Sequence, residues 1–115
     1  MTRREIKLNL DDVPWISIGR CGTSGTHEII FDFSMFTEAF GDGNFALLFV
    51  RPGDPDNQPL ENITVPVMIT GNKAKWIVRD IDTERTGAGA GQILYYGDTF
   101  RYKSNVFPIN VRRSI

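Results

Sequence analysis

The fold is decided by residues 76–111, which read WIVRDIDTERTGAGAGQILYYGDTFRYKSNVFPINV. Side chains over residues 76–80 alternate with a period of two, as they do in a pleated strand. Residues 92–96 are rich in the bulky side chains that favour strands, and Gly97-Asp98 then supplies a turn before a third extended stretch, residues 99–111. No apolar periodicity of helical length fits this segment. The segment therefore predicts an all-β fold.

The sequence upstream of residue 76 continues the pattern of short strands with turns between them. Gly71-Asn72 predicts a tight hairpin, and Pro66 places residues 63–70 at a sheet edge or a bulge, because proline has no N–H for the ladder. Ser34 is the expected N-cap of one short helix over residues 35–40. Further strands are predicted at residues 6–10, 15–20, 28–33 and 45–50. The last of these is almost wholly apolar, which predicts a central strand covered on both faces.

The strand count predicts the architecture. About eight short strands with turn signals at near-regular spacing favour an immunoglobulin-like two-sheet β-sandwich with one short helix between the third and fourth strands; a small barrel is the alternative. The length of 115 residues predicts a single domain spanning residues 1–115. The predicted core comprises Ile6, Leu8, Ile18, Ile30, Leu47, Phe49, Val67, Trp76, Val78, Leu94 and Val111.

Composition argues against several classes of protein. Thirteen basic and fourteen acidic residues give a net charge of −1 without any block of like charge, so we expect neither nucleic-acid binding nor attachment to an anionic membrane. The single cysteine, Cys21, excludes an intrachain disulfide and fits assembly in a reducing cytosol. The N-terminal residues have no apolar signal core, and no apolar run approaches the roughly 20 residues of a spanning helix. We therefore expect a soluble protein without a cleaved signal.

The residue types that carry catalysis or hold cofactors occur here without their usual partners. Cys21 and His27 lie six positions apart, but nothing in the spacing supplies the orienting third group of an activated thiolate. The glycine run at residues 87–91 leads into a strand rather than a helix, so it predicts a tight corner and no phosphate site. We therefore predict no enzyme activity, no catalytic residue, no cofactor and no small-molecule substrate.

Two acidic clusters are candidate sites for Ca²⁺, which prefers oxygen ligands. The first cluster is Asp54, Asp56 and Asn57, and the second is Asp80, Asp82 and Glu84. Turn chemistry is the alternative for the first, and a corner whose carboxylates accept backbone N–H groups is the alternative for the second. Neither cluster has the complete spacing of a helix–loop–helix calcium site, and we predict no bound metal.

Aromatic side chains offer a second kind of surface, either for sugars or for proteins. They are Trp15, Trp76, Tyr95, Tyr96, Phe100 and Tyr102. Adjacent strand residues point to opposite faces, so at most one of Tyr95 and Tyr96 lies in the core, and Trp76 is expected to be buried. For the aromatic residues that stay exposed we favour protein contact over sugar binding.

The ordered motifs of the chain resemble the N-terminal β-sandwich domain of tail or baseplate proteins from phages and prophages, similar to upper-baseplate-protein N-terminal domains. The motifs are Trp76, Asp82-Thr83, Gly87 and Gly89, Tyr95-Tyr96, Gly97-Asp98, Lys103-Ser104, and residues 107–111, with residues 29–32 and 51–54 upstream. The resemblance implies a non-enzymatic virion structural protein, assembled in the host bacterial cytoplasm, that acts as an attachment or adaptor module of the tail or baseplate. Its implied partners are other virion proteins or copies of itself. The alternatives are a decoration or fibre-anchoring protein of the capsid head and a carbohydrate-binding module for the host surface.

Sheet edges near the two chain ends are the expected contact surfaces, because an unprotected edge invites pairing with another chain. The predicted edges are residues 6–10 and 107–111, where charges and prolines are sparse. The candidate interface residues are Arg3, Arg4, Ile6, Leu8, Phe107, Ile109, Arg112 and Arg113.

Overall fold

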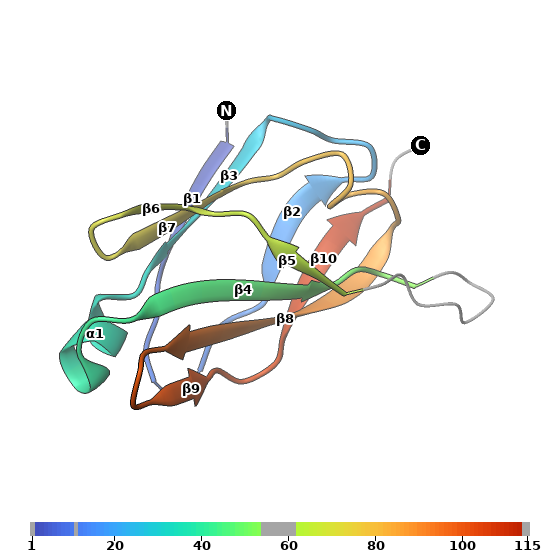
Figure 1. Ribbon diagram of the computed structural model, residues 1–115. Helices are drawn as coiled ribbons and strands as arrows, with labels where there is room; N and C mark the ends of the chain where they lie inside the picture. The colour runs from blue at the N-terminus through green and yellow to red at the C-terminus, as the bar shows by residue number, and fades with distance from the viewer. Residues whose placement is uncertain (1, 11, 54–61, 114–115) are drawn as a thin grey trace.

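Two mixed β-sheets and one short helix make up the protein (Figure 1). The structure is a computed structural model that describes residues 2–10, 12–53 and 62–113. The four-stranded sheet has the order β1 (Thr2–Lys7), β3 (His27–Asp32), β7 (Lys73–Ile77) and β6 (Met68–Thr70). The six-stranded sheet has the order β2 (Ile16–Arg20), β10 (Phe107–Arg112), β8 (Gly87–Tyr96), β4 (Asn44–Val50) and β5 (Asn62–Val65), and β9 (Arg101–Lys103) pairs with β8.

The pairing pattern explains why both sheets are mixed. Strand β1 runs parallel to β3 and β2 runs parallel to β10, whereas the other pairs are antiparallel. The predicted hairpin at Gly71-Asn72 joins β6 to β7, with Thr70 opposite Lys73. The prediction of a mostly β protein with one short helix between the third and fourth strands is confirmed. Because of the parallel pairs, the immunoglobulin-like topology stays a prediction.

One cluster of buried side chains lies between the two sheets. Phe49 of β4 meets Trp76 of β7 edge to face, with ring centroids 5.7 Å apart, so side chains of opposite sheets interlock. The predicted core residues that are buried are Ile6, Leu8, Ile18, Leu47, Phe49, Trp76, Val78 and Val111. Val67 is partly buried against them. The predictions for Ile30 and Leu94 are wrong, because their neighbours Ile29 and Ile93 point inward and a shift of one residue reverses the face.

The helix α1 (Ser34–Phe40) begins one residue earlier than predicted. Ser34 is therefore its first residue and not its N-cap; Phe33 occupies the cap position and has no capping side chain. The Asp32 carboxylate instead accepts a hydrogen bond from the Ser34 backbone N–H at 3.0 Å. This hydrogen bond lowers the pKa of Asp32 below its ordinary value.

Two strand predictions are corrected by the structure, one on where a strand ends and one on which faces of a strand are covered. The segment predicted as one strand at 63–70 is split, because Pro66 and Val67 carry the chain from β5 in one sheet to β6 in the other. Strand β4 is internal, as predicted, but only one of its faces is covered, since Leu48 remains 37% exposed. The apolar character of β4 therefore reflects an exposed apolar surface as well as the core.

The glycine run belongs to strand β8 and does not form the predicted corner. Gly89 and Gly91 face inward, where a Cβ atom at Gly89 would lie 2.5 Å from the Val50 carbonyl oxygen and one at Gly91 would lie 2.6 Å from Ile109 Cδ1. The alternation of glycine with outward-facing alanine is thus a strand pattern, in which hydrogen atoms replace side chains where neighbouring groups approach closely.

Candidate functional site

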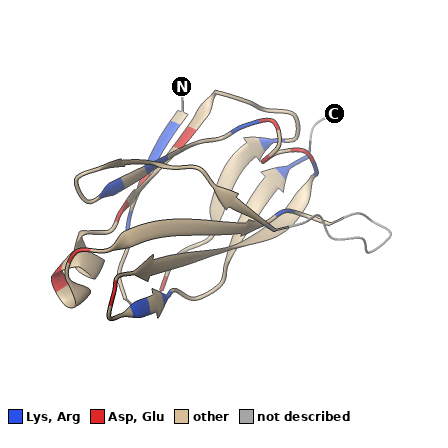
Figure 2. Cartoon of the chain, in the orientation of Figure 1, with Lys and Arg blue, Asp and Glu red and all other residues tan. Residues whose placement is uncertain are grey.

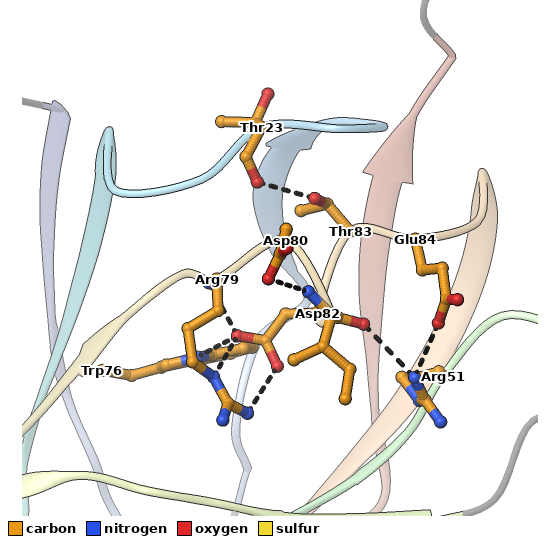
Figure 3. A network of polar contacts seen from close by, with 9 residues as sticks. Thr23, Arg51, Trp76, Arg79, Asp80, Asp82, Thr83 and Glu84 are labelled. Atoms are coloured by element: carbon orange, nitrogen blue, oxygen red, sulfur yellow. Dashed lines mark hydrogen bonds and ion pairs between the residues drawn. The ribbon is translucent and has the colours of Figure 1, made fainter.

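The acidic corner between β7 and β8 is built around Asp82, whose side chain is fully buried (Figure 3). Its Oδ2 atom accepts hydrogen bonds from Trp76 Nε1 at 3.0 Å and from the Arg79 backbone N–H at 2.8 Å. Its Oδ1 atom accepts a hydrogen bond from Arg79 Nη2 at 3.0 Å. Asp82 therefore ties the largest buried aromatic residue to the turn that follows β7.

The other acidic residues of this corner turn to different partners. Asp80 accepts a hydrogen bond from the Ile81 backbone N–H at 2.8 Å, and Glu84 pairs with Arg51 at 2.9 Å (Figure 3). Within the parts of the chain that the structure describes, no three metal-ligating side chains come together. Of the two alternatives for this cluster, a Ca²⁺ site and a corner whose carboxylates accept backbone N–H groups, the geometry supports the corner. The first acidic cluster, Asp54, Asp56 and Asn57, lies outside the described residues.

The thiol and the imidazole are held in separate contacts. Cys21 Sγ donates to the Glu84 carbonyl oxygen at 3.4 Å, whereas His27 Nδ1 lies 3.1 Å from Thr26 Oγ1. The His27 ring also packs on Gly19, where an added Cβ atom would lie 2.9 Å from His27 Cε1. Gly19 has a φ of +106°, so both its backbone conformation and this close approach require glycine.

The outer face of the four-stranded sheet carries charges that are paired with one another. Glu28 accepts from Arg3 at 2.6 Å and lies 3.3 Å from Lys75, while Lys73 pairs with Glu5 at 2.7 Å. The hydrogen bond from Arg3 lowers the pKa of Glu28, and Lys75 adds to this effect, whereas burial opposes it. The hydrogen bond to Glu5 raises the pKa of Lys73. These pairs neutralise most of the charge on this face.

An open groove of about 470 Å³ lies between the edge strands β1 and β2, where the two sheets leave their interior partly uncovered. Among its lining residues are Arg4, Trp15, Gly19, Arg20, His27 and Arg112. Arg4 projects from the inward-facing side of β1, opposite Ile29 of β3 in register. Trp15 precedes β2 and is 54% exposed. Arg20 and Arg112 are register partners at the ends of β2 and β10.

The groove is electrostatically positive. The Arg4 guanidinium lies 5.9 Å from the centroid of the Trp15 ring and donates to the Trp15 carbonyl oxygen at 3.4 Å. Arg20 donates to the Arg113 carbonyl oxygen at 2.9 Å. Neither of these arginines, nor Arg112, forms an ion pair with a described carboxylate. Glu28 also lines the groove, but its carboxylate is engaged by residues of the outer face.

The middle of the outer face of the six-stranded sheet, formed by β4, β5 and β8, is the second open surface and carries no charge, whereas Arg101 and Lys103 of β9 border it. Strands β4, β5 and β8 contain no charged residue, as Figure 2 shows. Leu48 and Tyr96 are 37% and 39% exposed, and Val106, in the loop before β10, is 64% exposed. Leu48, Val106 and Ala90 border a shallow hollow of about 110 Å³. We call this surface the apolar face.

The predicted interface residues occupy four different environments. Ile6, Leu8, Phe107 and Ile109 are buried in the core, so their side chains face away from any neighbouring molecule. Arg4 and Arg112 line opposite ends of the groove, Arg3 lies on the charged outer face, and Arg113 is exposed beside Arg20.

The predicted N-terminal edge at residues 6–10 is shifted, since β1 ends the four-stranded sheet but spans Thr2–Lys7, and the predicted edge at β10 is wrong. Strand β10 lies between β2 and β8, because the N-terminal part of the chain supplies a parallel neighbour that no local pattern signals. Sequence analysis missed Arg20, since the strand that it ends has no plainly polar face.

The aromatic residues divide as expected. Trp76 and Tyr95 are buried, whereas Tyr96 points to the opposite face and is exposed. Tyr102 is partly buried and donates to the Leu10 carbonyl oxygen at 2.6 Å, which fixes its ring against the core. Trp15 and Tyr96 are therefore the aromatic side chains among these that remain available to a partner.

No helix among the described residues is long and apolar enough to span a membrane.

Comparison with known proteins adds no relative. No protein-family model and no curated protein matches the sequence.

Proposed function

We propose that this chain is a non-enzymatic structural module of a bacteriophage virion, an attachment or adaptor domain of the tail or baseplate. In this proposal residues 1–115 form one immunoglobulin-like domain that binds other virion proteins or copies of itself. The motif order from Trp76 to Val111 supports the virion context through its resemblance to baseplate domains. The apolar face supports a role in assembly.

The apolar face is the observation that carries the proposal. Exposed Leu48, Tyr96 and Val106 gather on a sheet surface whose strands β4 and β8 lack any charge. On the opposite outer face, exposed Met68 and Ile77 lie among paired charges, which keeps that surface compatible with water. Exposed apolar side chains on an uncharged surface favour protein contact, because burying them removes apolar area from water.

The capsid head is a second possible location, since a decoration or fibre-anchoring protein would use the same kind of surface. Sugar binding is a candidate from a different functional class, and the exposed Trp15 ring beside a polar groove is the observation that favours it. If Trp15 serves as a sugar platform, the isolated protein should bind glycan through this ring. An assembly role does not require such binding, so a glycan-binding assay distinguishes the two functions.

The experiment is incorporation into particles. The parent chain should occur at a constant ratio to other particle proteins when virions released from cells carrying the gene are purified and quantified by mass spectrometry. Leu48→Asp places a charge on the apolar face and should abolish incorporation while the circular dichroism spectrum stays unchanged. Thr70→Asp, which places the same charge on the exposed β6 strand, is the matched control and should be incorporated normally.

Two results would contradict the proposal. Absence of the parent chain from purified particles would refute the virion assignment. Normal incorporation of Leu48→Asp would show that the apolar face is not the contact surface. Binding of host-surface glycans that is lost in Trp15→Ala, without any effect on assembly, would favour the carbohydrate-binding function.

A further inference from the structure

The groove between β1 and β2 differs from the apolar face in shape and charge. It is bordered by two strands that each end a sheet, so β1 and β2 both have one side without a described strand partner. The N–H and C=O groups along such an edge form a template for a further extended chain. A concave surface with an available strand edge is therefore suited to a polypeptide in extended conformation.

Charge marks the two ends of the β2 edge. At its start, Arg4 lies over the ring and carbonyl group of Trp15. At its end, Arg20 is the register partner of Arg112. Since none of the three arginines is paired with a described carboxylate, the groove presents positive charge that a partner can neutralise. Arginine forms bidentate hydrogen bonds with carboxylates, which favours an acidic partner.

Trp15 supplies an apolar contact at the Arg4 end of the groove. A tryptophan side chain with 54% exposure is unusual for a residue that normally buries most of its area. Tryptophan and arginine are among the residues most enriched at the positions that dominate the energy of protein interfaces. Their stacking in the groove provides a flat surface against which a side chain of the partner can pack.

We propose that this groove binds an extended acidic segment of another polypeptide, which adds as a strand to the edge of β2. The inference rests on the proposed function in one respect, that the partner is a protein, and it does not depend on the apolar face. It names the chemistry of one partner, whereas the proposed function names only the role.

The groove also sets the spacing of the acidic residues. The path from Trp15 to Arg20 covers five residue steps, or about 17 Å at about 3.3 Å per residue. Residues four apart in a strand lie on the same face and about 13 Å from each other, and the arginine side chains can bridge the remaining distance. Two carboxylates about four positions apart should therefore reach the Arg4 end and the Arg20–Arg112 end together.

The test is a selection from random peptides of about eight residues, long enough to follow β2. Peptides selected on the purified chain should be enriched in Asp or Glu at two positions about four apart, with β-branched or aromatic residues between them. Binding of a selected peptide should weaken as ionic strength rises and should shift the backbone amide NMR signals of β1 and β2.

The decisive variant replaces the groove charges, Arg4→Gln, Arg20→Gln and Arg112→Gln together. It should bind the selected peptide roughly tenfold more weakly, as expected for the loss of three exposed ion pairs. If this variant does not fold, Arg112→Gln alone should weaken binding about two- to fivefold. Arg101→Gln with Lys103→Gln on the distant strand β9 is the matched control and should bind like the parent.

The outcomes separate this inference from the proposed function. Selection of peptides without acidic enrichment, selection of none, or equal binding to the triple variant would overturn the inference. Displacement of the peptide by an acidic oligosaccharide of higher affinity would assign the groove to sugars, and displacement by inorganic phosphate of equal affinity would make it a simple anion site. Leu48→Asp should bind the peptide normally, so failure of the apolar face and failure of the groove give different results.

Discussion

Replacement of Asp82 by alanine tests the central structural claim about the acidic corner. The carboxylate accepts hydrogen bonds from Trp76 Nε1 and from the Arg79 backbone N–H, and both donors use the same oxygen atom. In Asp82→Ala these two donors lose their acceptor inside a fully buried site. The Arg79 side chain, which also donates to Asp82, is partly exposed and can turn to water.

The expected loss of stability follows from these contacts. A buried donor left without a partner costs about 1–3 kcal/mol, so the two donors that lose Asp82 cost about 2–6 kcal/mol together, and Arg79 adds little because its side chain can turn to water. We therefore expect Asp82→Ala to lower the free energy of unfolding by about 3–5 kcal/mol, a large share of the roughly 5–15 kcal/mol that stabilises a domain. Asp82→Asn keeps an oxygen acceptor for Trp76 and should lie between the parent and the alanine variant.

Urea unfolding followed by tryptophan fluorescence and by circular dichroism measures this loss directly. With an m-value of about 1–1.5 kcal/mol/M for a chain of this size, the midpoint should fall by about 2–5 M or the variant should be unfolded without urea. Asp80→Ala is the matched control, because its exposed carboxylate makes only a local hydrogen bond and should change stability by about 0.5 kcal/mol at most.

Equal stability of the Asp82→Ala and Asp80→Ala variants would refute the reasoning. The chelator EDTA should leave the midpoint of the parent unchanged. A drop in the midpoint with chelator, together with equal sensitivity of both variants, would mean that the corner holds a cation instead.

Three further predictions concern the strand glycines, the charged face and the cysteine. Gly91→Ala should lower the free energy of unfolding by about 1–3 kcal/mol because its Cβ atom would collide with core side chains, whereas Ala90→Ser on the opposite face should be near neutral in the same urea titration. The lowered pKa of Glu28 means that its contribution to stability is complete above its ordinary value of 4.5 and is lost as pH falls through the folded-state pKa. Glu28→Gln should therefore be less stable than the parent at neutral pH, and the difference should shrink below pH 4.5; a difference that grows on acidification would contradict the pairing. Cys21→Ser should melt within a few degrees of the parent, since a hydroxyl group can donate to the same carbonyl oxygen; a large drop would assign the thiol a packing role.

Local patterns identified most strands but not every inward face. Alternation located β3 and β8, yet it assigned Ile30 and Leu94 to the core in place of Ile29 and Ile93. In both places several apolar residues follow one another, so the period-two pattern has no polar residue to mark its phase. Where polar residues do alternate, as around Ile6, the predicted face is correct.

The glycine run shows a different limit. Glycine is the strongest local signal for a turn, so residues 87–91 predicted a corner. The reason for these glycines lies in segments distant along the chain, because Val50 approaches Gly89 and Ile109 approaches Gly91 too closely for any side chain. The residues next to the glycines in the sequence give no signal of these contacts.

The sequence by itself determined the mostly β character, the single short helix, the hairpin at Gly71-Asn72 and the burial of Trp76, since all of these follow from period, turn chemistry and side-chain size. Only the tertiary structure decided which strands are edges and which charges meet. Strand β10 pairs with β2 although the two lie near opposite ends of the chain, which removes one predicted edge and brings Arg112 to Arg20. The physical reason is that backbone hydrogen bonds are the same for every pair of strands, so the choice of partner depends on how all the apolar faces are buried together.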